Sequence, residues 1–155
     1  MIPYLQKLAQ YDAWANQQVC ASVASVPKDA PPVARDKVAT LLAHLAAAKR
    51  VWLNRIAGKA AGIEVWPKLE LDAATELLTQ ADREFVELTL KLDLAELTRP
   101  VIYRTSRGQS HATPLVDVVT QVINHSTYHR GQLASAIAAA GGTAAASDYI
   151  VWARR

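Results

Sequence analysis

Two histidines four residues apart, His125 and His129, are the residues of this chain whose spacing most directly suggests chemistry. They lie in the run Ile-Asn-His-Ser-Thr-Tyr-His-Arg-Gly-Gln. An α-helix has about 3.6 residues per turn, so this spacing places both imidazoles on one helix face, where they can converge on one metal ion. His44 lies in a separate helical stretch and completes a three-ligand set if the two helices pack side by side. The pattern therefore favours a metal site between two helices.

Three further residues near these histidines have expected roles. Gln132 follows His129 by one helical turn and is expected to hydrogen-bond a ligand imidazole or a metal-bound water. Arg130 points at least a quarter turn away and is expected in a surface or interhelical salt bridge. His111 lies outside the helical pattern and is expected to be a surface or turn residue.

Other histidine chemistries fit this chain less well. A lone helical histidine on an apolar face is usually a hydrogen-bonded core residue, and this interpretation is favoured for His44 taken by itself. Di-iron carboxylate bundles need Glu-x-x-His pairs on two helices, and the sequence contains no Glu-x-x-His. A phosphotransfer bundle with one nucleophilic histidine is a remote alternative, because it leaves the His125 and His129 pair unexplained.

The positions of apolar residues predict four amphipathic helices that would place the histidines. Their expected ranges are Tyr4 to Val23, Lys37 to Ala57, Asp72 to Leu92, and Pro114 to the Gly141-Gly142 pair. Asp72 and Thr113 are the expected N-caps of the last two helices. The segment 27–36 holds three prolines and is expected to be a connection, and residues 58–71, with an exposed-looking Trp66, are expected to form a loop.

A short β-hairpin is expected between the third and fourth helices. Val101, Tyr103 and Thr105 alternate with polar neighbours, and Ser106-Arg107-Gly108 is expected to turn the chain back towards Gln109 and His111. The predicted fold class is therefore all-α, a four-helix bundle with a hairpin inserted before the last helix.

Length and composition restrict the class of protein. The 155 residues fit a single domain over 1–155, with 51% hydrophobic and 20% charged residues. The net charge of +3 is scattered along the chain, which argues against nucleic-acid binding. No apolar run approaches the roughly twenty residues of a membrane span and no leader is evident, so a cytoplasmic protein without a membrane partner is expected. Cys20, the single cysteine, is expected to be a small buried hydrophobe.

The sequence resembles the DinB/YfiT-like superfamily over nearly its whole length. The resemblance rests on Tyr11-Asp12-Ala13-Trp14-Ala15-Asn16, on Leu42-Ala43-His44-Leu45 with Trp52, on Asn124 to Gln132, and on Ser147-Asp148-Tyr149-Ile150. It implies a four-helix bundle with up-down-down-up connectivity and frequently a homodimer. It also implies a divalent metal site whose ligands carry over onto the three histidines that the spacing selects, His44, His125 and His129.

The expected function follows from such a site. Three neutral imidazoles leave a divalent ion with open positions, where zinc would bring the pKa of water to about 7 or deprotonate a thiol. Zinc or nickel is the expected metal, and iron or manganese would also accept these ligands. The superfamily implies a small-molecule substrate, with thiol-dependent S-transferase-like or hydrolase-like chemistry. The alternatives are a non-catalytic, stress-associated metal-binding protein and, less favoured, an interaction module. No general base stands out, so catalytic residues are not assigned.

Overall fold

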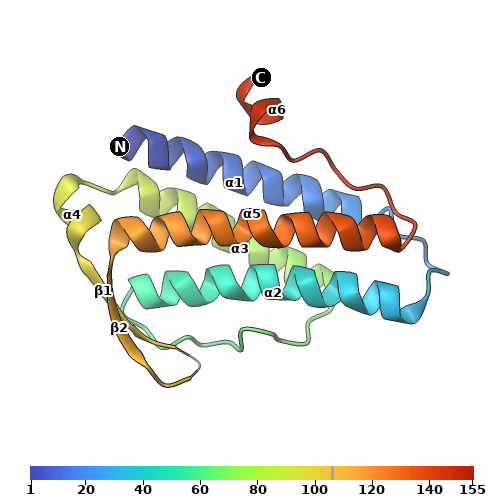
Figure 1. The fold of residues 1–155 in the computed structure, drawn as a ribbon, viewed down its shortest axis with the longest axis horizontal. Coiled ribbons are helices and arrows are strands. Elements are labelled where there is room, and N and C mark those ends of the chain that lie inside the picture. The colour runs from blue at the N-terminus through green and yellow to red at the C-terminus, as the bar shows by residue number, and fades with distance from the viewer. Residues whose placement is uncertain (106) are drawn as a thin grey trace.

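The computed structural model describes residues 1–105 and 107–155, and within them the chain is mostly helical with one small antiparallel sheet (Figure 1). The helices and strands are, in chain order, α1 (Ile2–Val23), α2 (Pro32–Ile56), α3 (Leu71–Leu90), α4 (Leu94–Thr98), β1 (Pro100–Arg104), β2 (Ser110–Pro114), α5 (Leu115–Ala139) and α6 (Tyr149–Ala153).

The long helices α1, α2, α3 and α5 lie alongside one another (Figure 1). Helix α1 packs against α3 and α5, and α2 packs against the same two helices from the other side. Helices α2 and α5, which carry the three histidines of the predicted site, are therefore direct neighbours.

The core consists of two apolar clusters at opposite ends of the long helices. One cluster contains Phe85 and Val118, and the other contains Leu42 and Leu133. Buried polar side chains occupy the helix turns between the two clusters. The predicted site belongs to this middle region, because His44, His125 and His129 lie near the midpoints of their helices.

The helix starts differ from the sequence-based expectations. Helix α2 begins at Pro32, five residues before the predicted Lys37, because a proline in the first turn loses no helical hydrogen bond. The expected N-caps Asp72 and Thr113 are wrong: the N-cap residues are Glu70 for α3 and Pro114 for α5. Neither makes a side-chain capping bond, so the capping rule had no signal to detect at these two positions.

The helix ends agree better with expectation. Gly58 follows the end of α2 with a φ of +69°, and Gly141 follows the end of α5 with a φ of +84°. Both angles lie in the left-handed region that glycine adopts without steric cost, so these residues stop the helices as predicted. Helix α1 ends at Val23, the last residue of its predicted range. Its first predicted apolar position, Tyr4, is 59% exposed and lies outside the core.

The predicted β-hairpin is confirmed. Strands β1 and β2 pair antiparallel, with Val101 opposite Thr113 and Tyr103 opposite His111. The predicted turn includes Ser106, which lies outside the described residues. The five-residue helices α4 and α6 were not predicted, because each is too short for an apolar period to emerge.

Two composition-based expectations can be compared with the structure. No helix among the described residues is long and apolar enough to cross a membrane. Cys20 is partly buried, and burial, with a smaller contribution from the nearby Asp82, raises the pKa of its thiol to about 11. The thiol is therefore protonated at neutral pH, which agrees with its expected role as a small hydrophobe.

Candidate metal centre

The three predicted histidines converge in the structure. His44 comes from α2, His125 and His129 come from α5, and one ring nitrogen of each lies within 4.8 Å of the others. The Nε2 atoms of His44 and His129 are 3.1 Å apart. Two nitrogens that each bind a tetrahedral zinc at about 2.0–2.1 Å stand about 3.3 Å apart. The His44 and His129 nitrogens are therefore already close to the spacing that a metal ion requires.

The loop between α2 and α3 orients His44. The Nδ1 atom of His44 donates a hydrogen bond to the carbonyl oxygen of Val65, with a distance of 2.7 Å. A carbonyl only accepts, so the proton lies on Nδ1 and the lone pair of Nε2 faces His129. The indole of Trp66 stacks on the His44 ring with centroids 3.6 Å apart and planes 9° apart. Residues 57–70 thus hold this imidazole in the tautomer that a metal ligand needs.

One ring nitrogen of His129 is buried without a hydrogen bond to the described residues. Its side chain is 8% exposed, and its Nδ1 atom has no hydrogen-bond partner among the described residues. Gln132 lies on the same side, as predicted, and its side chain acts to raise the pKa of His129 against the lowering caused by burial, yet it completes no hydrogen bond to Nδ1. An unsatisfied buried nitrogen beside two other imidazoles is typical of a site built for a further group.

Electrostatics keep the cluster neutral. Burial lowers the pKa of all three imidazoles, and for His44 and His125 the neighbouring histidines lower it further. The pKa of His125 falls to about 4. All three rings are therefore uncharged at neutral pH, which is the form that binds a cation.

The donor set fits a divalent transition metal. Without a cation, the short contact between the two Nε2 atoms requires His129 to donate a hydrogen bond to His44. The buried Nδ1 of His129 then carries no hydrogen and has no hydrogen-bond partner among the described residues. His44 and His129 would hold a cation through their Nε2 lone pairs, and Nδ1 of His129 would then carry the hydrogen of a bond that the side-chain oxygen of Gln132 can accept. Imidazole nitrogens suit zinc, nickel and iron.

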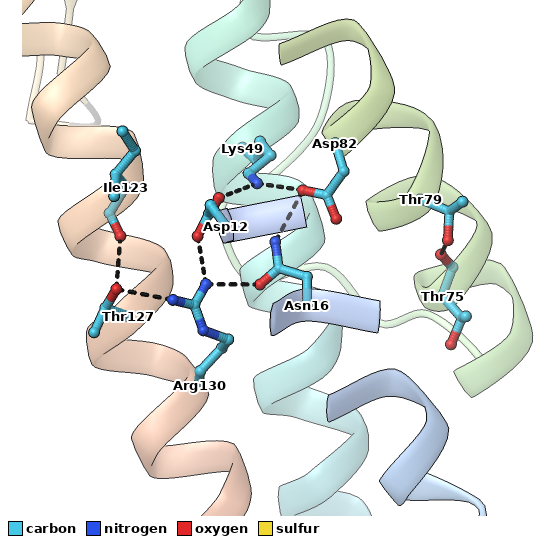
Figure 2. A network of polar contacts seen from close by, with 9 residues as sticks. All are labelled: Asp12, Asn16, Lys49, Thr75, Thr79, Asp82, Ile123, Thr127 and Arg130. Atoms are coloured by element: carbon cyan, nitrogen blue, oxygen red, sulfur yellow. Dashed lines mark hydrogen bonds and ion pairs between the residues drawn. The ribbon is translucent and has the colours of Figure 1, made fainter. Parts of the chain in front are cut away.

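A network of buried charges lies beside the histidines, and Figure 2 shows how it joins the long helices. Lys49 of α2 donates hydrogen bonds to Asp12 of α1, at 2.6 Å, and to Asp82 of α3. Arg130 of α5 donates to Asp12 and to Asn16, the latter at 3.0 Å. All five side chains are buried, and the two carboxylates balance the two cations.

This network lies next to the candidate metal centre. Arg130 follows His129 directly in α5, and the charge of Asp12 acts to raise the pKa of His125 against the larger lowering by burial. The prediction of an interhelical salt bridge for Arg130 is confirmed. The sequence did not single out Asp12, Lys49 and Asp82 as a set, although a charged residue next to the apolar stripe of a helix is a signal of a buried ion pair.

The remaining predicted residues lie away from the cluster. The Tyr11 hydroxyl donates to the carbonyl oxygen of Ser147, at 2.9 Å, and its ring packs against those of Trp14 and Tyr149. His111 is exposed on β2 and stacks on Tyr103, outside the group of converging histidines. It is a surface residue, as expected.

Fold and site together define a mostly helical protein with a largely buried cluster of three neutral histidines that can hold a metal ion. The chain belongs to the DinB family, whose sequence profile matches residues 1–154. It is similar to Protein DinB of Bacillus subtilis (strain 168), with 25% identity over 160 residues that cover 96% of this chain and 93% of the relative. No solved structure matches the chain.

Proposed function

We propose that the chain binds one divalent transition-metal ion through His44, His125 and His129. The observation that carries this proposal is the convergence of one nitrogen from each ring within 4.8 Å. The lowered pKa values add support, because they keep the ligands unprotonated at neutral pH. Zinc or nickel is the first choice, and iron or manganese would also accept these ligands.

Elemental analysis of protein purified without a histidine tag tests the metal site. We expect about one transition-metal ion per chain, lost when His125→Ala and His129→Ala are combined. His111→Ala is the matched control, because this histidine is exposed and lies outside the cluster. Retention of the metal by the double variant, or failure of the unmodified protein to take up zinc or nickel, would contradict the proposal.

The site further supports an enzyme that acts on a small molecule, with thiol-dependent S-transferase-like or hydrolase-like chemistry. A metal held by three imidazoles supplies Lewis-acid chemistry at its open positions. His125 is only partly buried, so the cluster is not fully sealed from solvent. The protein's own contribution is to fix the ring of His44, through the carbonyl of Val65 and the stacked indole of Trp66.

Turnover assays decide between the two reaction classes. The metal-loaded protein would be supplied with low-molecular-weight thiols and a chlorinated aromatic electrophile, or with an activated ester. S-transferase chemistry predicts loss of the thiol together with the electrophile, whereas hydrolysis predicts ester cleavage without a thiol. Activity that is equal in the unmodified protein and the His125→Ala, His129→Ala variant would not originate at this site.

A non-catalytic metal-binding role is the second candidate, and the burial of two ligands favours it. His44 is 3% exposed and His129 is 8% exposed, values that suit an ion placed to join helices. A metal at this point would bridge α2 and α5 within the core. This role predicts a gain in stability on metal binding without turnover.

The arrangement of the chain around the site is proposed to be the up-down-down-up bundle. In Figure 1, α2 and α3 begin at the same end of the molecule, because residues 57–70 run back along α2. The hairpin then intervenes between α3 and α5. A homodimer stays a prediction, and sedimentation analysis of the full chain tests it.

A further inference from the structure

A cavity lies away from the histidines, between the end of α2 and the β-hairpin. It has a volume of about 470 Å³, and its polar lining consists of Arg55, Lys59, Tyr103, Arg104 and Ser110. The hairpin and the start of residues 57–70 come together at this end of α2 (Figure 1). Three separate chain segments therefore contribute to one pocket.

The charges around this cavity are all of one sign. Among the described residues that line it are three cations and no carboxylate. Within residues 1–105 and 107–155, Arg55, Lys59 and Arg104 form no salt bridge, whereas Arg50 on the same helix pairs with Glu84. Lys59 lies near enough to Glu84 to contribute to lowering its pKa, so the two arginines carry the argument.

Arg55 is held in place by aromatic rings. Its guanidinium lies 4.7 Å from the centroid of Trp52 and 4.8 Å from that of Tyr103. One of its NH2 groups donates to the carbonyl oxygen of Arg104, at 3.1 Å. Burial lowers the pKa of Arg55. A guanidinium has five N–H donors, so this fixed group keeps donors for a further acceptor.

Arg104 is also oriented by backbone contacts. Its Nε and NH2 groups both donate to the carbonyl oxygen of Gly108, at 3.3 and 3.2 Å. Ser110, the register partner of Arg104 across the hairpin, lines the same cavity and carries a hydroxyl group. Two positioned guanidinium groups and a hydroxyl are the chemistry that recognises phosphate or carboxylate oxygens.

We propose that this pocket binds the oxyanion of a small organic ligand, a phosphate or a carboxylate attached to an apolar or aromatic body. Ala60, Ala61 and Ile102 supply an apolar wall beside the cations. Arg55 follows His44 by eleven residues, a rise of about 16 Å along α2. The pocket is therefore a site separate from the histidine cluster, and it stands whether or not the cluster binds a metal.

Nuclear magnetic resonance titration of the full chain tests the proposal, with arginine Nε–Hε signals as the readout. The probes are inorganic phosphate, phenyl phosphate and benzoate. We expect phenyl phosphate to bind more tightly than inorganic phosphate, because its ring adds apolar contact. Arg55→Gln and Arg104→Gln should each raise the dissociation constant by about tenfold, the effect of one charge-assisted hydrogen bond.

The controls separate this pocket from other places where an anion binds. Arg35→Gln removes the same charge from an exposed position near the start of α2 and should leave the affinity unchanged. Arg104 is exposed, so its substitution leaves the core intact and keeps the test valid if Arg55→Gln loosens the hairpin. Binding that survives both pocket substitutions, that weakens equally with Arg35→Gln, or that is absent for all three probes would overturn the proposal.

Discussion

The ammonium group of Lys49 is buried in the core, and two carboxylates compensate its charge. Its side chain is 1% exposed and contacts Asp12 and Asp82. Replacing Lys49 with Met keeps much of the volume but leaves two carboxylates without their shared cation. We expect Lys49→Met to reduce the free energy of unfolding by about 3–5 kcal/mol, the usual effect of breaking a buried ion pair. Urea denaturation followed by circular dichroism measures this loss.

A matched surface variant controls for the loss of a lysine. Lys91 is exposed directly after α3, so Lys91→Met removes the same charge at a solvated position and should change stability by less than about 0.5 kcal/mol. If both variants unfold at the same urea concentration, the contacts of Lys49 contribute no more than a surface charge does.

His125 should make the metal-free protein sensitive to acid. Burial, followed by the two neighbouring histidines, lowers its pKa to about 4, whereas an unfolded histidine titrates near about 6.5. As pH falls from about 6.5 to 4, His125 binds a proton in the unfolded state but stays neutral in the folded state. The free energy of unfolding of chelator-treated protein should therefore decrease across this window.

Substitution of the histidine isolates this effect. His125→Gln should make the pH dependence between about 6.5 and 4 shallower, because the variant has no proton to gain at this position. His111→Gln, at an exposed residue, should leave the slope as it is. Equal slopes for His125→Gln and the unmodified protein would assign the acid sensitivity to other groups.

At the scale of elements, residues 57–70 act as a support for the metal ligand on α2. The carbonyl of Val65 fixes the proton of His44, and Trp66, itself 53% exposed, stacks on the ring. Trp66→Leu removes the stacking but leaves the three ligands. We expect the dissociation constant for zinc to rise about tenfold or more, as for other losses of a ligand's supporting contacts.

Competition with a chromophoric chelator measures this change in affinity. Trp152→Leu is the matched control, because Trp152 lies on α6 and packs against Tyr11, away from the histidines. An unchanged zinc affinity in Trp66→Leu would mean that the hydrogen bond to Val65 alone orients His44. A loss of affinity in both variants would point to general destabilisation.

Local sequence signals predicted the long helices and the hairpin but not every boundary. Apolar periodicity sets the helix interiors, and Gly58 and Gly141 mark their ends. The start of α2 was misplaced because Pro31 and Pro32 can either break a helix or begin one, and only packing decides. Thr113 was misassigned for a similar reason: it pairs with Val101 in the hairpin, and this pairing places it in β2.

The candidate site was predictable where its geometry depends on one helix. The spacing of His125 and His129 fixes their common face on α5, and His44 was the remaining helical histidine. The stacking of Trp66 on His44 depends on the path of a loop, which no periodic pattern encodes. The pairing of Lys49 with Asp12 depends likewise on how α2 and α1 meet.

At the scale of the whole molecule, the buried polar layer divides the core into two apolar halves. Asp12, Lys49, Asp82 and Arg130 lie between the two clusters, one on each long helix. Buried charges must meet their partners, so a slip of one helix along another would leave charges unpaired in the core. We infer that this layer sets the axial register of the helices and thereby brings α2 and α5 into the alignment that the histidines need.

A metal ion at the histidines should therefore stabilise the whole fold, because it joins α2 to α5 at the level of this layer. A ligand at one hundred times its dissociation constant adds about 2.7 kcal/mol to the free energy of unfolding. For a chain of this length, such a gain raises the melting temperature by about 5–10 °C. Calorimetry of the zinc-loaded and chelator-treated protein measures the difference, and the His125→Ala, His129→Ala variant should show none.

Equal melting temperatures for the loaded and stripped forms would remove the support for a structural metal. A large shift without turnover of thiols or esters would favour a metal that serves the fold.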